Sequence, residues 1–328
     1  MFIIQVHIVV LKYYLHLGVR LERIISGMRF DQAPWMRDYV LFNTRQRQLS
    51  KTPTEKQMFK FLTNSLYGRT LLNQRKIVDV KLITNEKTAR NVIAKPTFES
   101  FHVINENLTL CKLRNGVIKW MQPTQVGATI LDYAKLRMYE FHYGYVMNKF
   151  ALNARLLFSD TDSLAYEIAV DDLYESIKND VDKYFDTSNY EIDNCAYSDK
   201  NKMKLGYFKD ELGGKQAIEF IGLKSKMYSI KMNDDDDKIT CKGVSKSFVK
   251  KHIRHEMYKD VLFNNLETNA SFKTINSRQH VLCTREINKK ALSSYDANRF
   301  IIHCGNKIVS LPLGHFQINR YLARNNTS

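Results

Sequence analysis

The chain has 328 residues, 44% of them hydrophobic, which is enough for about two or three packed units. Lysine and arginine number 50 against 34 acidic residues, and the net charge of +16 favours a polyanionic partner, nucleic acid above all, although a basic protein without such a partner also fits. The five scattered cysteines form no C-x-x-C pair, which argues against zinc sites and disulfide frameworks and favours a reducing intracellular setting.

The amino-terminal run MFIIQVHIVVL is apolar, but it has neither a basic leader nor a small-residue cleavage site. It is also shorter than the roughly 20 residues that a bilayer span needs. We therefore expect a buried strand or the start of a helix, and no membrane partner. Its abrupt start suggests that the sequence begins inside a domain. Apolar positions at helical spacing continue over residues 7–30, until Pro34 breaks the pattern.

Two basic helices are predicted next, over residues 35–50 and 54–72, and together they indicate a helical hairpin. Thr52 or Thr54 is suited to cap the second helix. The basic residues of this hairpin are Arg37, Arg45, Arg47, Lys51, Lys56, Lys60 and Arg69.

Strand-like and helical segments follow. Residues 76–120 contain short β-like pieces between Asn and Gly turns, which predicts a β-rich insertion. Residues 124–146 are amphipathic and helical, and residues 154–168 indicate two strands around a tight polar turn. The later predicted elements are a helix over 171–185, an acidic exposed loop at 234–237 and a basic surface helix over 246–259.

The tight polar turn contains Asp160 and Asp162, which an extended strand would place on one face. Hard cations such as Mg²⁺ bind carboxylate oxygens and leave positions for phosphate oxygens. The same spacing occurs in Asp180 and Asp182, on a predicted polar helix face without an evident metal role, so the spacing alone is weak. The apolar runs LLF and SLAYEI on either side indicate buried strands with only the turn polar, which favours the pair at 160 and 162.

On the second basic helix, Lys60, Asn64 and Tyr67 share one face because they are spaced i, i+4 and i+7. This face offers a cation for phosphates, an amide and an aromatic plate, and Gly68 leaves space for a base or a template strand. A core tyrosine, a solvated lysine and a packing glycine would give the same pattern. A carboxylate turn and a cationic, aromatic helix in one basic chain are, together, the two halves of a nucleotidyl-transfer site.

These motifs resemble those of the family B DNA polymerases, and within them the protein-primed branch of bacteriophages, adenoviruses, linear plasmids and Polinton (Maverick) elements. The run from Lys60 to Gly68 is similar to the fingers motif, Asp160-Thr161-Asp162-Ser163 to the palm metal motif, and Lys226-Met227-Tyr228 to the K-x-Y motif that holds the primer terminus. Flanking runs in the order of the Polinton-type branch extend the resemblance over nearly the whole chain: LHLGVRLERI, WMRDYVLFNTRQRQ, ILDYAKLRMYEFHY, GYFKDELGG and EINKKALSSYDANRF.

The resemblance implies a role for each matching residue. Asp162, with Asp160 beside it, would be the principal catalytic carboxylate and ligand of Mg²⁺ in a two-metal site. The other implied contacts are Lys60, Asn64 and Tyr67 with the nucleotide, Arg45 or Arg47 with its phosphates, and Gly68, Lys226 and Tyr228 with DNA. Outside this order of motifs, Lys226 and Tyr228 would fit an ordinary strand.

The implied fold is α+β, a partial right-hand polymerase with an antiparallel palm sheet and an acidic β-hairpin. Its expected parts are a palm edge at 1–34, helical fingers at 35–75, a β-rich insertion at 76–120, palm at 121–245 and thumb at 246–328. The implied activity is that of a DNA-directed DNA polymerase, which transfers a nucleotide from a dNTP to a primer 3′ hydroxyl on a DNA template-primer. A terminal protein would serve as the first primer, and the nucleus would be the location for a eukaryotic mobile element.

Two parts of the family pattern are absent: the first palm motif, which supplies the other essential metal ligand, and the proofreading exonuclease. The sequence therefore fits either a fragment or a decayed copy with weak or no independent catalysis, and a catalytically inactive DNA-binding remnant is a second hypothesis. An RNA-templated polymerase is disfavoured because those enzymes usually carry adjacent aspartates at the hairpin, whereas Thr161 separates Asp160 and Asp162 here.

Overall fold

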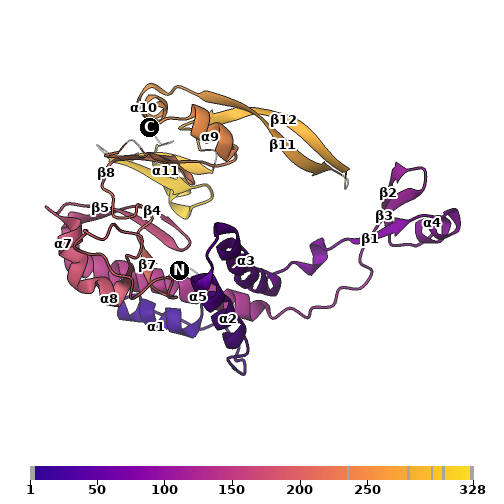
Figure 1. The fold of residues 1–328 in the computed structure, drawn as a ribbon, viewed down its shortest axis with the longest axis horizontal. Helices are drawn as coiled ribbons and strands as arrows, with labels where there is room; N and C mark the ends of the chain where they lie inside the picture. The colour runs from indigo at the N-terminus through magenta and orange to yellow at the C-terminus, as the bar shows by residue number, and fades with distance from the viewer. Residues whose placement is uncertain (1–3, 235, 279–280, 297, 305–306, 326–328) are drawn as a thin grey trace. The chain divides into compact units, whose positions relative to one another are not determined.

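The computed structural model describes residues 4–234, 236–278, 281–296, 298–304 and 307–325. The chain divides into two compact units, residues 1–214 and 215–328, each described here by itself (Figure 1). Both contain helices and small antiparallel sheets. This agrees with the predicted α+β class, while the division into palm, fingers and thumb stays a prediction. No helix in the described part of the chain is long and apolar enough to cross a membrane.

The first unit begins with helix α1 (Ile8–His16), one of the two alternatives predicted for the apolar start. Of residues 7–30, where the apolar positions have helical spacing, only those of α1 form a helix. Residues 17–36 form no regular helix or strand and expose almost all of their side chains. The basic hairpin is confirmed as α2 (Arg37–Leu49) and α3 (Pro53–Thr70). Thr52 caps α3, and Pro53 at its first position fixes a helical φ without losing a needed N–H donor.

Residues 74–113 form a small β-rich module (Figure 1). After the 3₁₀ turn η1 (Gln74–Lys76), strands β1 (Asp79–Ile83), β3 (Leu108–Leu113) and β2 (Phe98–Asn105) pair in that order, all antiparallel. Helix α4 (Glu86–Ile93) accompanies them, although the sequence pattern predicts only strands there. The helix places Val92 with Ile83, Cys111 and Leu113 in a buried apolar cluster.

A long helical run follows, as predicted for residues 124–146. It consists of α5 (Thr124–Phe141), the π-helical turn η2 (His142–Val146) and α6 (Met147–Phe150). The 3₁₀ turn η3 (Ala151–Asn153) then leads into the predicted hairpin of β4 (Ala154–Asp160) and β5 (Ser163–Ile168). Side chains on one face of the hairpin pack against a core that includes Phe141 and Tyr145 of the helical run.

The helix predicted over 171–185 is interrupted. It consists of α7 (Leu173–Ile177), the 3₁₀ turn η4 (Lys178–Asp180) and α8 (Val181–Tyr184). Strands β6 (Phe185–Asp186) and β7 (Phe208–Lys209) then make a short parallel pair.

In the second unit, strands β8 (Ala217–Lys224), β9 (Met227–Met232) and β10 (Lys238–Cys241) form an antiparallel sheet with β9 in the centre. The helix predicted over 246–259 is instead two helices, α9 (Lys246–His252) and α10 (His255–Asn264). Ile253, between the two helices, and Tyr258, within α10, are fully buried, so this segment forms part of the core and not only a surface. The apolar residues of KSFVKKHIRHEMYK are the sequence signal for this burial.

The second unit ends with two hairpins and a helix, namely β11 (Thr268–Arg278) with β12 (Val281–Leu292), β13 (Arg299–Cys304) with β14 (Lys307–Pro312), and α11 (Phe316–Asn325). The acidic loop predicted at 234–237 is exposed at Asp234 and Asp236 and half-buried at Asp237, while position 235 lies outside the described residues.

Candidate functional site

The acidic turn joins β4 and β5 through the two residues Thr161 and Asp162. Thr161 has a φ of +57°, in the left-handed region that a β-branched residue rarely adopts. The Asp162 N–H donates to the Asp160 carbonyl oxygen over 2.6 Å, so Thr161 is the centre of a γ-turn of positive φ, a rare and strained conformation. Strain of this kind costs on the order of 1–3 kcal/mol and is concentrated at functional sites.

Hydroxyl groups next to the turn bond to Asp160. The Ser163 hydroxyl donates to the Asp160 carbonyl over 3.2 Å, and the Thr161 hydroxyl donates to the Asp160 carboxylate over 3.4 Å. Asp160 is the last residue of β4 and is half-buried, whereas Asp162 is exposed within the turn. Because Asp162 lies in the turn and not in a strand, the alternation of side chains along a strand does not set the direction of its carboxylate. The expectation that an extended strand places both aspartates on one face therefore does not apply to Asp162. The flanking strands are less covered than their apolar sequence indicates, because every residue of β4 and β5 is half-buried or exposed.

The D-x-D pairs at 160/162 and 180/182 differ in their surroundings. Asp180 accepts hydrogen bonds from the Tyr145 hydroxyl and the Lys149 ammonium group, and Asp182 forms an ion pair with Lys200. The Asp162 carboxylate contacts no cationic side chain in the part of the chain that the structure describes. An exposed carboxylate without a protein counter-ion remains available to an added cation.

The predicted nucleotide face lies on α3, where a capping box fixes the start of the helix. The Thr52 hydroxyl accepts the Glu55 N–H over 3.2 Å, and the Glu55 carboxylate accepts the N–H groups of Lys51 and Thr52. These backbone donors, those of Thr52 first, lower the pKa of Glu55.

The predicted residues of this helix are accessible. Lys60 and Asn64 are exposed and Tyr67 is half-buried. A Cβ atom placed on Gly68 would meet no other atom within 4 Å, so Gly68 is not a packing glycine and leaves open space beside Tyr67. On α2, Arg45 is exposed, while the buried Nε of Arg47 has no hydrogen-bond partner within the described parts of the chain.

A cavity of about 3000 Å³ in the first unit brings two of the predicted elements together. Asn64 and Tyr67 of α3 line it, and so do Ser159, Thr161 and Ser163 at the acidic turn. Lys60, Arg45 and Arg47 are not among the described residues of its lining. Small-molecule sites usually enclose roughly 300–1,000 Å³, so this cavity is larger than a typical small-molecule site.

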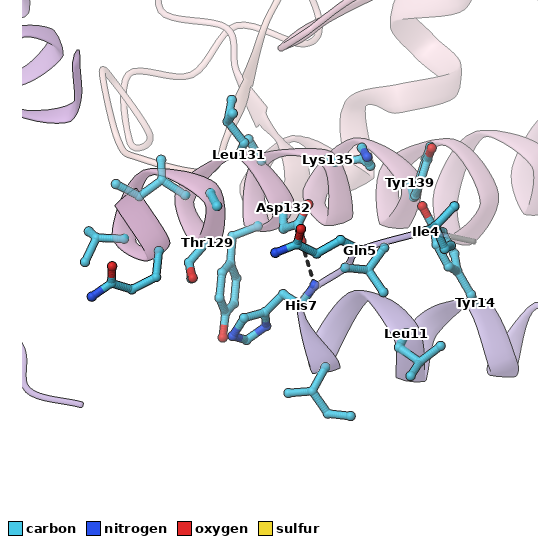
Figure 2. A pocket seen from close by; sticks show the side chains of 18 of the residues that line it. Ile4, Gln5, His7, Leu11, Tyr14, Thr129, Leu131, Asp132, Lys135 and Tyr139 are labelled. Carbon is cyan, nitrogen blue, oxygen red and sulfur yellow. Dashed lines mark hydrogen bonds between the residues drawn. The ribbon is translucent and has the colours of Figure 1, made fainter. Parts of the chain in front are cut away.

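The segment around α1 and the helix α5 form another wall of the cavity. Figure 2 shows Asp132, Lys135 and Tyr139 on α5, with His7 and Tyr14 on the facing segment. The His7 N–H donates to the Asp132 carboxylate over 2.6 Å, which ties the residues before α1 to α5 (Figure 2).

The cavity is lined by arginines other than those that the sequence predicts for the site. They are Arg20, Arg23, Arg29 and Arg37, all exposed, and within the described ranges none of them forms an ion pair. Trp35 and Phe30 also line the cavity and are 60% and 47% exposed. The mixture of arginine and apolar residues in VRLERIISGMRF is the sequence signal that indicates such a surface.

Lys226 and Tyr228 belong to the second unit. Lys226 is exposed and has a φ of +57° in the two-residue turn between β8 and β9. Tyr228 lies in the central strand β9 opposite Gly222 and Thr240, and its ring is 6.0 Å from that of Phe220. The structure therefore brings Lys226 and Tyr228 together on one strand-and-turn segment.

The carboxylates of the acidic turn are an incomplete set for a metal ion. Among the described residues, no group of three or more His, Cys, Asp or Glu side chains is arranged to hold one. Two carboxylates fit one side of a Mg²⁺ site, and the remaining ligands must come from phosphate, water or a further carboxylate. Comparison with known proteins adds no assignment, because no protein-family model, curated protein or solved structure matches the chain.

Proposed function

We propose that the chain is the nucleotide-binding and DNA-binding part of a DNA-directed DNA polymerase similar to the protein-primed branch of family B. The observation that carries the proposal is the shared cavity, whose lining includes Asn64 and Tyr67 of α3 and Thr161 of the acidic turn. The reaction is attack of a primer 3′ hydroxyl on the α-phosphorus of a dNTP. The hydroxyl gives up its proton to water, a new phosphodiester bond forms, the bond from the α-phosphorus to the bridging oxygen breaks, and pyrophosphate leaves with the electron pair.

Residues of α2 and α3 bind the nucleotide in this proposal. Lys60 neutralises the triphosphate, with Arg45 or Arg47 as a second cation. Asn64 and Tyr67 shape the pocket for sugar and base, and Gly68 leaves room for the template strand. Lys226 and Tyr228 contact the DNA primer, and a terminal protein is the candidate first primer.

Asp160 and Asp162 are the proposed ligands of Mg²⁺, a cofactor that supplies charge neutralisation at the reacting phosphate when it is bound. The exposed Asp162 carboxylate, without a cationic neighbour among the described residues, supports this role. Because the ligand set is incomplete among the described residues, phosphate oxygens, water or a further carboxylate would complete the site.

That incompleteness favours a second candidate function, a DNA-binding remnant without catalysis. The net charge of +16 supports DNA binding in either case, so DNA affinity does not separate the two candidates.

Primer extension on a DNA template-primer with Mg²⁺ and dNTPs separates them. For the polymerase we expect extension by the unmodified chain and its loss in Asp162→Ala. Asp182→Ala is the matched control, because it has the same D-x-D spacing but an aspartate already paired with Lys200, and it should keep the activity. DNA binding without extension by the unmodified chain would support the remnant. Equal losses in the two variants would contradict the role of Asp162.

A further inference from the structure

Gly127 lies inside helix α5, at the place where α5 meets the end of α3. A Cβ atom at this position would lie 2.4 Å from Cγ of Leu71 and 2.5 Å from Oγ1 of Thr70. Glycine in a helix interior is less favourable than alanine by about 1 kcal/mol. The close approach of α3 therefore gives a physical reason for a residue that local helix preference disfavours.

The two neighbours of Gly127 differ in their freedom to move. Leu71 is 38% exposed, so its side chain can rotate toward solvent. Thr70 is 3% exposed, and its hydroxyl donates to the Tyr67 carbonyl over 2.7 Å. A rotation of Thr70 would break this bond inside a packed contact. A methyl group at position 127 therefore has to displace the last turn of α3, which carries Tyr67.

The same helical run contacts the acidic hairpin at its other end. His142, the first residue of η2, has its Nδ1 3.0 Å from the Tyr166 hydroxyl of β5, and the two rings lie nearly parallel with centroids 5.9 Å apart. Burial lowers the pKa of His142 and raises that of Tyr166. Both groups are then neutral at pH 7, and a hydrogen bond joins Nδ1 and the Tyr166 hydroxyl.

Gly127 and His142 are therefore two contact points on one continuous helical run. At 1.5 Å per residue they are separated by about 22 Å along the axis. One contact lies at the end of α3, the helix that carries Asn64 and Tyr67, and the other lies against strand β5 of the acidic hairpin.

We propose that Gly127 is a positioning residue, whose missing side chain sets the approach of α3 to α5 and thereby the distance between the Asn64–Tyr67 face and the acidic turn. The geometric part of this inference stands on the contacts alone. Its consequence for nucleotide binding rests on the proposed function.

The test is Gly127→Ala in the full chain, with genetically encoded spin-label amino acids at positions 57 on α3 and 167 on β5. Both positions are exposed, so the labels leave the contact intact. An ordinary contact needs about 3.4 Å instead of 2.4 Å, so the end of α3 should move by about 1 Å, and the mean distance between the labels should change by a similar amount. Binding of dATP with Mg²⁺, measured by calorimetry on unlabelled protein, should weaken about tenfold or more, because a misplacement near 1 Å is enough for such a loss.

The matched control is Gly144→Ala. Gly144 lies in η2 of the same run and has open space around the Cβ position, so its label distance should stay unchanged. Adding Thr70→Ala and Leu71→Ala to Gly127→Ala removes both obstructing side chains and should restore the distance and the dATP affinity. This rescue variant also tests the inference if Gly127→Ala alone fails to fold.

An unchanged label distance in Gly127→Ala, or a rescue variant that keeps the shifted distance, would overturn the inference. Failure of the proposed function has a different signature: no dATP binding by the unmodified chain, whatever the label distance does.

Discussion

Two pairs of aspartates with the same spacing, Asp160 with Asp162 and Asp180 with Asp182, have opposite relations to the fold. Asp180 and Asp182 lie in the segment from η4 to α8, and each is held by a lysine, Lys149 or Lys200. Asp162 lies in a strained turn and contacts no cation among the described residues. The first pair stabilises its surroundings through contacts already formed, whereas the turn keeps a carboxylate available at the cost of backbone strain. Spacing therefore does not distinguish an exposed carboxylate without a cationic neighbour from one paired with lysine, whereas the environment does.

The largest expected effect that separates the two pairs is on stability. Asp180→Ala removes the acceptor of the buried Tyr145 hydroxyl and the partner of Lys149, so it should lower the free energy of unfolding by about 2 kcal/mol. Asp162→Ala removes an exposed side chain and should change this free energy by no more than about 0.5 kcal/mol. Urea unfolding followed by circular dichroism measures both. Similar unfolding midpoints for the two variants would show that the environments do not differ as described.

A smaller effect is expected at the turn itself. Thr161→Gly should stabilise the protein by up to about 1 kcal/mol, because glycine adopts positive φ without the steric cost that a β-branched residue has. The control is Thr129→Gly within α5, where the same change should destabilise the helix by a few tenths of a kcal/mol. The same unfolding experiment applies to both variants. Destabilisation by Thr161→Gly would mean that the turn is not strained.

Much of the fold can be predicted from the sequence because its signals are local. The helical periods of α2, α3 and α5 and the paired apolar runs of β4 and β5 identify these elements close to their ends. The break of the predicted helix over 171–185 into α7, η4 and α8 cannot be seen in this way, because tertiary packing decides it. Helix α4 does have local signals, an Asn85 cap and a Glu86–Arg90 pair at i,i+4, which the β-rich interpretation of this stretch missed. Segment 17–36 shows the opposite limit, since its apolar spacing resembles a helix but its backbone forms none.

For the candidate site, the sequence identifies residue types but not their environments. It indicates Asn64, Tyr67 and the acidic turn, and their common cavity depends on how α3 and the hairpin pack around α5. The strain at Thr161 and the close contact at Gly127 also have no sequence signature, because they depend on a backbone angle and on a neighbour more than 50 residues away in the chain. The roles carried by the polymerase resemblance stay predictions until activity and binding are measured.

The smallest expected effect concerns Glu55, a third kind of carboxylate, held by backbone N–H groups. Because these donors lower its pKa below the ordinary value of 4.5, the ionised form stabilises the folded chain above that pH, and the contribution is lost as the pH falls through the folded pKa. Glu55→Gln should therefore lower the melting temperature slightly at pH 7, and the difference from the unmodified chain should shrink as the pH falls below 4.5 and disappear below the folded pKa. Thr52→Ala is the control, because it removes a cap acceptor that does not titrate and should lower stability by about 1 kcal/mol at both pH values. A stability penalty of Glu55→Gln that persists unchanged at low pH would contradict this expectation. It would show that the charge of Glu55 contributes nothing to the cap, and that only carboxylates with a lysine partner, such as Asp180, are held by the fold through their charge.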